Sequence, residues 1–189
     1  MLADLVKANR SYRRFQEDKP VAHETLRQLV DLTRYAASAQ NLQPLKYILS
    51  STPEKNSLIF PHLAWAGYLK EWPGPEEGER PAAYIIILGD REITRNYYCN
   101  DGIAAQTMLL AAVELGLQGC MIANIQREKL RAALNIPEKY DIMLAIAFGY
   151  PNETVVLEEV KNGDIRYWRD EKSVHHVPKR SLSEIILDL

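Results

Sequence analysis

Apolar residues recur along this 189-residue chain at two spacings, and each spacing predicts a different kind of element. Apolar side chains three or four residues apart predict a short first helix that ends near Asn9 and a longer helix over 23–37. Continuous apolar or β-branched runs predict buried strands. We therefore expect strands at 45–49, 83–88, 118–122 and 141–148, and further short helices at 53–60 and 126–134.

The stretch from Asp101 to Leu115 is the most helix-like segment of the chain, and it is apolar on almost every side. Such a helix belongs in the centre of a fold or at a large subunit interface. Gly116 is placed to end it. By contrast, residues 72–81 are dense in proline, glycine and charge, which predicts a mobile surface loop.

The segment that follows the last predicted strand is polar, with a turn signal at Asn162-Gly163 and a last helix near 183–187. It has too little apolar content for a second core. We therefore expect it to wrap over another surface, such as that of a partner subunit. Interleaved strands and helices in a chain of this length predict a single domain, 1–189, of the α/β or α+β class with a mixed sheet.

Charge and composition narrow the classes of function. The formal net charge of −2 and the pI near 6.1 give no basic field, so we expect no nucleic-acid or membrane partner. The N-terminus has no apolar signal region and no apolar stretch approaches membrane length, which predicts a cytoplasmic protein.

The metal-binding residue types are few and poorly placed. Cys99 and Cys120 lack a metal-type spacing, and Cys120 lies in an apolar run where a thiol behaves as a small hydrophobe. His175 and His176 are neighbours in an extended segment, so their side chains point opposite ways, and no carboxylate partner is evident. We predict no metal site.

Three polar clusters suit one anionic ligand when they are taken together. Residues 10–15, Arg-Ser-Tyr-Arg-Arg-Phe, offer guanidiniums and a hydroxyl that can grip a phosphate, although a solvated basic turn has the same composition. The amide-rich run 37–44 can read the edge of a planar heterocycle, or it is a polar turn after a helix. Lys179-Arg180 either adds to a phosphate site or forms a solvated face.

In their order and spacing, these clusters resemble the motifs of the nitroreductase family of FMN enzymes over nearly the whole chain. Residues 10–15 look like the family's Arg-Ser-x-Arg-x-Phe signature, and 38–44 match its Ser-x-x-Asn-x-Gln-Pro motif. Residues 101–122 resemble its long central helix and the Gly-Leu-x-x-Cys strand that follows. The resemblance implies an α+β fold with a mixed central sheet flanked by helices, a homodimer, and a C-terminal tail that wraps around the partner subunit.

Carried over position by position, the resemblance implies a cofactor site built from both subunits. Arg10 and Ser11 would hold the FMN phosphate together with the C-terminal pair Lys179-Arg180. Arg13 would lie near the pyrimidine end of the flavin, and the 38–41 segment would reach the flavin of the neighbouring subunit. The expected cofactor-binding residues are Arg10, Ser11, Tyr12, Arg13, Ala37, Ser38, Asn41, Gln43, Met121, Ile122, Ala123, Asn124, Lys179 and Arg180.

Three positions depart from the family pattern. Ala37 stands where proline is frequent, and Leu45 stands where tryptophan is frequent. Ala123-Asn124 stands where many quinone- and nitro-reducing members carry Glu-Gly. These departures leave the flavin site intact and bear on the substrate face and the donor preference. Asn124 also has a second interpretation, as the N-cap of the following helix.

The resemblance implies an oxidoreductase that passes electrons from NADH or NADPH through FMN to a small acceptor, nitroaromatic or quinone-like, in a ping-pong sequence. The flavin carries the redox chemistry and the protein supplies binding and orientation, so we predict no catalytic side chain. Two alternatives stay open. One is a specialised flavin enzyme of the same fold, such as a reductive dehalogenase, and the other is a non-catalytic flavin- or nucleotide-binding module.

Overall fold

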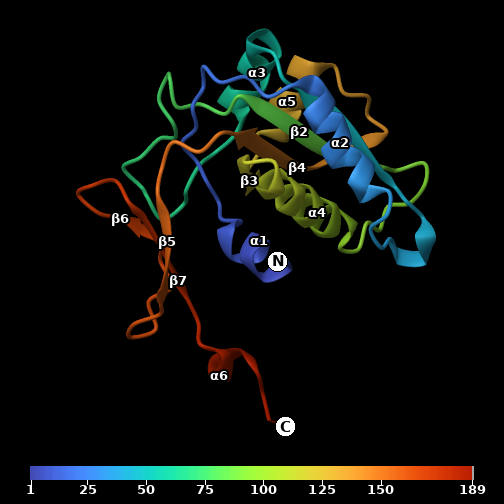
Figure 1. Ribbon diagram of the computed structural model, residues 1–189. Helices are drawn as coiled ribbons and strands as arrows, with labels where there is room; N and C mark the ends of the chain where they lie inside the picture. The colour runs from blue at the N-terminus through green and yellow to red at the C-terminus, as the bar shows by residue number, and fades with distance from the viewer. Residues whose placement is uncertain (189) are drawn as a thin grey trace.

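The computed structural model describes residues 1–188, and its centre is a four-stranded antiparallel sheet with the strand order β1-β2-β4-β3 (Figure 1). At the edge of this sheet, the outer side of β3 receives a parallel bridge between Ser11 and Gly119. The N-terminal segment therefore lies along the sheet edge. The strands are β1 (Leu45–Ser50), β2 (Ala83–Asp90), β3 (Gln118–Ile122) and β4 (Tyr140–Gly149).

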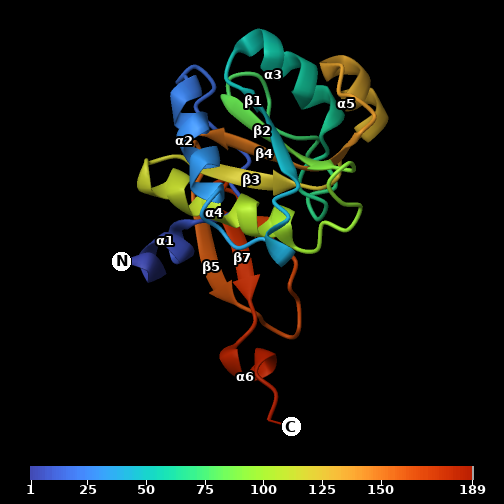
Figure 2. The same cartoon turned by 90° about the vertical axis from the view of Figure 1, so that its right-hand side faces the viewer.

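The strand β2 is buried along its whole length, and its alternating side chains divide the core in two. Tyr84 and Ile86 belong to the cluster that packs against α3 (Pro53–Ile59) and α5 (Arg127–Leu134). Ile85 and Ile87 belong to the cluster that packs against α2 (His23–Thr33) and α4 (Asn100–Glu114). Helices thus cover both faces of the sheet, which Figure 2 shows from the side. Burial on both faces explains why β2 reads as an uninterrupted apolar run.

The helices and strands predicted for residues 1–149 are all present, and α1 (Leu2–Ala8) begins the chain. The largest difference in bounds is at α2, which ends at Thr33 rather than at residue 37. Residues 34–36 donate to carbonyls three positions back, the tighter pattern in which helices commonly end. The α+β class is confirmed. The four strands pair antiparallel with one another, and the Ser11–Gly119 bridge adds a parallel element at the edge.

The C-terminal segment contains a small sheet that the sequence pattern did not predict. β5 (Val155–Glu159) pairs parallel with β7 (His175–Lys179), which pairs antiparallel with β6 (Trp168–Arg169). We call this sheet the ribbon. Histidine, proline and lysine fill β7, so it lacks the apolar signal of a strand. The turn at Asn162-Gly163 is confirmed, since both residues have positive φ (53° and 73°).

The chain ends with a helix that is separate from the body of the molecule. α6 (Leu182–Ile185) follows the ribbon and overlaps the helix predicted near 183–187. Both views place α6 well away from the central sheet and its helices (Figures 1 and 2). The residues of α6 are exposed, including Leu182 (68%) and Ile185 (62%).

The 72–81 loop lies on the surface as expected, but several contacts hold it against the N-terminal segment. Glu17 accepts hydrogen bonds from the main-chain N–H groups of Gly78 (2.6 Å) and Arg80 (3.2 Å). Arg14 forms a two-point ion pair with Glu79. These contacts hold the second half of the loop against the N-terminal segment, and the mobility of the loop stays a prediction.

Gly119→Ala should destabilise the fold, because an added Cβ would lie 2.6 Å from Leu109 Cδ2 and 2.7 Å from the carbonyl oxygen of Ala147. Overpacking of this kind costs about 1–3 kcal/mol. Gly102→Ala in α4 is the matched control, because nothing lies within 4 Å of its added Cβ and alanine favours a helix. Thermal unfolding should give a lower midpoint for Gly119→Ala alone, and equal midpoints would contradict the close approach at β3.

Candidate functional site

The N-terminal motif begins where α1 ends and runs along the start of β3. Asn9 is the C-cap of α1, and its side-chain oxygen accepts a hydrogen bond from Gln106 of α4 (3.1 Å). Ser11 is exposed opposite Gly119, and Tyr12 donates its main-chain N–H to the Gly119 carbonyl oxygen (3.1 Å). These contacts fix the main chain on both sides of Ser11.

The Arg10 side chain is held in place but is not fully hydrogen-bonded. Its Nη2 donates to the Val6 carbonyl oxygen in α1 (2.9 Å), whereas Nε is buried and has no hydrogen-bond partner within residues 1–188. Burial lowers the pKa of Arg10, although the neighbouring Tyr12 opposes this shift. A buried donor without an acceptor is costly. An anion bound beside Ser11 would supply that acceptor.

The two arginines that follow are engaged by the protein itself. Arg13 Nη1 lies 3.2 Å from both the Ser11 carbonyl oxygen and His175 Nε2, and its guanidinium lies 4.9 Å from the centre of the Tyr167 ring. The ion pair with Glu79 takes up Arg14. A carboxylate from a distant loop therefore neutralises Arg14, and the predicted contact of Arg10 and Ser11 with the phosphate stays a prediction.

Tyr12 is half-buried and packs against the core cluster that contains Phe15. Burial is the main reason why its pKa is raised, and the charge of Glu153 adds to the shift. The structure therefore gives Tyr12 a packing role, and its predicted cofactor contact stays a prediction.

The end of β3 passes from the core to the surface. Ile122 is buried, while Ala123 and Asn124 are exposed. The Asn124 carbonyl oxygen accepts from the Ala64 main-chain N–H (3.0 Å), which fixes the strand end against the 60–72 segment. The N-cap of α5 is Gln126, so the interpretation of Asn124 as an N-cap is wrong. Met121 is partly buried and packs against the α2–α4 core.

The loop that follows α2 is tightly structured and strained. Gln40, Asn41 and Gln43 all have positive φ (52°, 54° and 50°), a conformation that costs non-glycine residues energy. Ser38 Oγ accepts from the Gln43 main-chain N–H (3.0 Å), and Gln43 Nε2 donates to Asn41 Oδ1 (3.1 Å). Ala37, Ser38 and Gln43 line a small cavity of about 160 Å³ against the first turns of α4. Strain of this kind is characteristic of functional loops.

Within one chain, the structure does not bring the predicted residues into one site. The 37–43 loop lies at one side of the molecule and α1 with Arg10 at the other, in both views (Figures 1 and 2). No hydrogen bond or ion pair among residues 1–188 joins Arg10 to Lys179 or Arg180. Instead Arg180 pairs with Glu184 in α6 (3.3 Å), and Lys179 is exposed at the end of β7.

Comparison with known proteins decides the family, since residues 6–150 match the family model described as the nitroreductase family. The chain belongs to the nitroreductase family. The predicted family, its α+β fold and the expectation of an oxidoreductase are thereby confirmed. The matched residues include the N-terminal motif, the 37–43 loop and β3, whereas the ribbon and α6 lie beyond them.

Individual members of the nitroreductase family are similar at low sequence identity. YodC of Bacillus subtilis (strain 168), provisionally assigned as an NAD(P)H nitroreductase, is 23% identical, with 77% of this chain and 87% of that protein covered. A nitroreductase family protein from Streptococcus pneumoniae TIGR4 covers both chains completely, with a TM-score of 0.70 and 17% identity. An FMN-dependent nitroreductase from Clostridium difficile R20291 has a TM-score of 0.64 and 24% identity, over 84% of this chain and 90% of its own.

The two histidines of β7 face different groups, as predicted. His175 is 1% exposed beside Arg13, whereas the ring of His176 stacks on Trp168 with 4.0 Å between centroids. Glu158 Oε1 lies 2.5 Å from His176 Nδ1, and Asp170 Oδ2 lies 3.4 Å from Nε2. The expectation that no carboxylate accompanies the histidines is therefore wrong. These carboxylates lie at opposite ring nitrogens, and in the described part of the chain no group of His, Cys, Asp and Glu is arranged to hold a metal.

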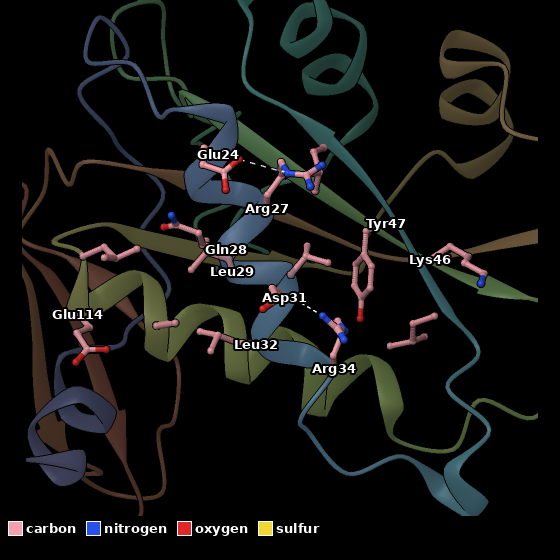
Figure 3. Close-up of a pocket in the computed structure, with 15 residues that line it drawn as sticks. Glu24, Arg27, Gln28, Leu29, Asp31, Leu32, Arg34, Lys46, Tyr47 and Glu114 are labelled. Atoms are coloured by element: carbon pink, nitrogen blue, oxygen red, sulfur yellow. Dashed lines mark hydrogen bonds and ion pairs between the residues drawn. The ribbon is translucent and has the colours of Figure 1, made fainter.

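A large groove lies between α2, β1 and α4 (Figure 3), and it shares Arg34, Leu45 and Tyr47 with the small cavity beside the 37–43 loop. Its volume is about 750 Å³. Four of its charged residues form two local ion pairs, Glu24 with Arg27 (3.3 Å) and Asp31 with Arg34 (2.7 Å), and Lys46 and Glu114 also line it. Of the leucines on its wall, Leu32 (44%) and Leu115 (49%) are exposed. Locally neutralised charge over an apolar wall favours a protein contact rather than a charged ligand. Within residues 1–188, no helix is long and apolar enough to cross a membrane.

Acidification should destabilise the fold partly through His175. Burial, followed by the charges of Arg13 and Arg169, lowers the pKa of His175 to about 4 from an ordinary 6.5. Between these values the unfolded chain binds a proton that the folded chain does not. The stabilisation is therefore complete above pH 6.5 and is lost as the pH falls towards 4, by up to about 3 kcal/mol.

His175→Gln keeps an acceptor for Arg13 and removes this titration. Its free energy of unfolding should change less than that of the wild type between neutral pH and pH of about 5. His176→Gln is the control. Although burial opposes its charged form, the bonds to Glu158 and Asp170 raise the pKa of His176, so its contribution is lost on the alkaline side of 6.5. If the free energy of unfolding of His175→Gln falls with acid as much as that of the wild type, this would contradict a buried, neutral imidazole at His175.

Proposed function

We propose that the protein is an FMN-dependent oxidoreductase whose flavin binds along the β3 edge. The observation that carries the proposal is Arg10, whose buried Nε has no acceptor beside the exposed Ser11. Gly119 lies opposite Ser11, and five residues beyond Gly119 the exposed residues Ala123 and Asn124 follow the end of the same edge. At the rise of a β-strand, Gly119 and Asn124 are about 17 Å apart. A ligand that reaches both ends is elongated, with an anionic group at one end and a planar group at the other, as FMN is.

The residues present fit this cofactor. Arg10 and Ser11 would hold the phosphate, Arg13 would lie at the pyrimidine end, and main-chain groups of 121–124 would line the ring. When bound, FMN would supply two-electron chemistry, accepting hydride from NADH or NADPH and reducing a small nitroaromatic or quinone-like acceptor in ping-pong order. The NAD(P)H assignment of the Bacillus relative and the FMN dependence of the Clostridium protein support this proposal. The side chains position and neutralise, and none acts as acid or base.

The site would be completed by a second copy of the chain. Ile103, Leu110 and Val113 form a half-buried apolar stripe on α4, next to the α2–β1–α4 groove. Unpartnered apolar surface of this kind is typical of a subunit interface. A second subunit packed there would bring its 37–43 loop to the first subunit's β3 edge, which accounts for the separation of the two motifs within one chain.

The C-terminal tail would also contribute to the proposed dimer. Its apolar side chains are strongly exposed in the single chain, including Ile186 (56%) and Leu187 (73%). Exposed apolar side chains in a short terminal segment favour docking on another surface. Docked on the partner subunit, the tail would place Lys179 and Arg180 near a phosphate. We also propose that residues 1–189 form a single domain.

Purified protein should carry flavin absorbance or acquire it when FMN is added, and anaerobic NADH or NADPH should bleach that absorbance. Reoxidation by a quinone or a nitroaromatic compound would identify the acceptor class. Bound flavin that neither nucleotide bleaches would indicate a binding module. If FMN changes neither the unfolding midpoint nor the flavin fluorescence, the proposal is wrong.

Arg10→Ala should weaken FMN binding about ten- to hundredfold, because a hydrogen bond to a charged group is worth roughly 1.5–3 kcal/mol. The loss should be larger at low salt. Arg166→Ala is the control, since its guanidinium pairs with Asp164 on an exposed turn of the ribbon (2.6 Å). Fluorescence titration measures both dissociation constants. An unchanged constant for Arg10→Ala would remove Arg10 from the site.

Mixing two inactive variants should restore activity if the sites are shared. Arg10→Ala damages the phosphate end in its own subunit, whereas Asn41→Ala damages the loop that reaches the partner's site. A mixed dimer then has one site with both lesions and one with neither, so activity should partly return after subunit exchange. Mixed dimers that are verified by mass and keep the full defect would contradict shared sites.

A further inference from the structure

Glu153 is a carboxylate buried at the junction of three segments. It lies between β4 and β5, and its side chain is 0% exposed. Its Oε1 accepts hydrogen bonds from the main-chain N–H groups of Arg13 and Arg14 (3.2 Å for Arg14). Its Oε2 accepts from Arg169 Nη2 in β6 (2.9 Å). A buried charge persists only when it is paired and hydrogen-bonded, and Glu153 meets both conditions.

The partners of Glu153 belong to two separate parts of the proposed site. Arg13 and Arg14 continue the main chain from Arg10-Ser11, which lies at the start of the β3 edge. Arg169 belongs to the ribbon, whose strand β7 ends at Lys179, and its guanidinium lies 4.2 Å from the centre of the Trp72 ring. One carboxylate therefore connects the N-terminal motif, the ribbon and the start of the 72–81 loop.

The geometry points to Glu153 as a positioning residue for the phosphate end of the cofactor site. Through the N–H groups of Arg13 and Arg14 it fixes the main chain that presents Arg10 and Ser11. Through Arg169 it fixes the ribbon that ends in Lys179 and Arg180. Glu153 touches no cofactor atom itself, and this inference rests on the proposed FMN function.

An alternative role for Glu153, as a neutraliser of nearby charge, makes the opposite prediction. Arg13 and Arg169 surround the carboxylate, and Arg14 is already paired with Glu79. If Glu153 acted on an anion only through its charge, removal of that charge would raise the positive potential and tighten phosphate binding. If it acts by position, withdrawal of its oxygens weakens binding even when the charge is kept.

The test compares two variants that separate the charge of the Glu153 carboxylate from the position of its oxygen atoms. Glu153→Asp keeps the charge but withdraws the carboxylate by one carbon–carbon bond, away from the two N–H groups. Glu153→Gln combined with Arg169→Met keeps an oxygen for both N–H groups, removes the charge, and leaves no unpaired guanidinium. Glu158→Asp is the matched control, because Glu158 binds His176 in the ribbon without touching the N-terminal motif.

FMN dissociation constants are measured by fluorescence below the unfolding midpoint of each variant. Glu153→Asp should weaken binding roughly tenfold, because it loses hydrogen bonds to a charged group that hold the main chain in place. Glu158→Asp should stay near the wild type. The Gln–Met double variant keeps an oxygen for the N–H groups of Arg13 and Arg14 but loses the link to the ribbon, so it should bind more weakly than the wild type and more tightly than Glu153→Asp. Amide hydrogen exchange without FMN gives an independent readout, and residues 10–15 should exchange faster in Glu153→Asp alone.

Two other results would overturn the inference, and a third would refute the proposed function. A Glu153→Asp protein with a lower unfolding midpoint but wild-type affinity and exchange would reduce Glu153 to a structural residue and overturn the inference. Tighter binding by the double variant would assign Glu153 to charge neutralisation and also overturn it. Failure of the wild type to bind FMN would refute the proposed function, while the exchange experiment would still test the positioning of 10–15.

Discussion

The structure depends on the contact between the N-terminal segment and the outer edge of β3. An edge strand exposes unpaired main-chain groups, and here the segment around Ser11 and Tyr12 closes the first part of that edge. The contact requires Gly119, because a side chain there would collide with α4 and β4. Once the segment is docked, Arg10 is held beside α1, Arg13 reaches the ribbon, and Phe15 enters the core. The edge of β3 therefore fixes the positions of the residues of the 10–15 motif relative to one another.

The elements that bury apolar surface could be predicted from the sequence, since burial leaves a repeating signal. The run in β2 and the apolar sides of α4 are direct results of packing on both faces. The ribbon left no such signal, because β7 is held by ion pairs and stacked rings rather than by an apolar face. The motif residues could be predicted from their order. Their partners Glu79 and Glu153 could not, because each pairing joins residues more than sixty positions apart.

The same limit explains why the sequence pattern did not show the partner of Arg14 or the place of Asn124 before α5. Arg13 and Arg14 are the same residue type at neighbouring positions, yet only the folded chain shows that Glu79 neutralises Arg14. Asn124 has the residue type of an N-cap, but α5 begins three residues later and leaves its side chain exposed. In both cases the residue type suits the interaction that the local pattern predicts. The tertiary structure decides which residue forms that interaction.

A site divided between two subunits accounts for features that a single chain leaves without a purpose. These are the strained 37–43 loop far from Arg10, the apolar stripe of α4, and the exposed tail. Sedimentation velocity recorded at the flavin absorbance tests this account most directly. The account predicts that all protein-bound FMN sediments with the dimer and that dilution to monomer releases it. Flavin that remains bound to a sedimenting monomer would contradict the account.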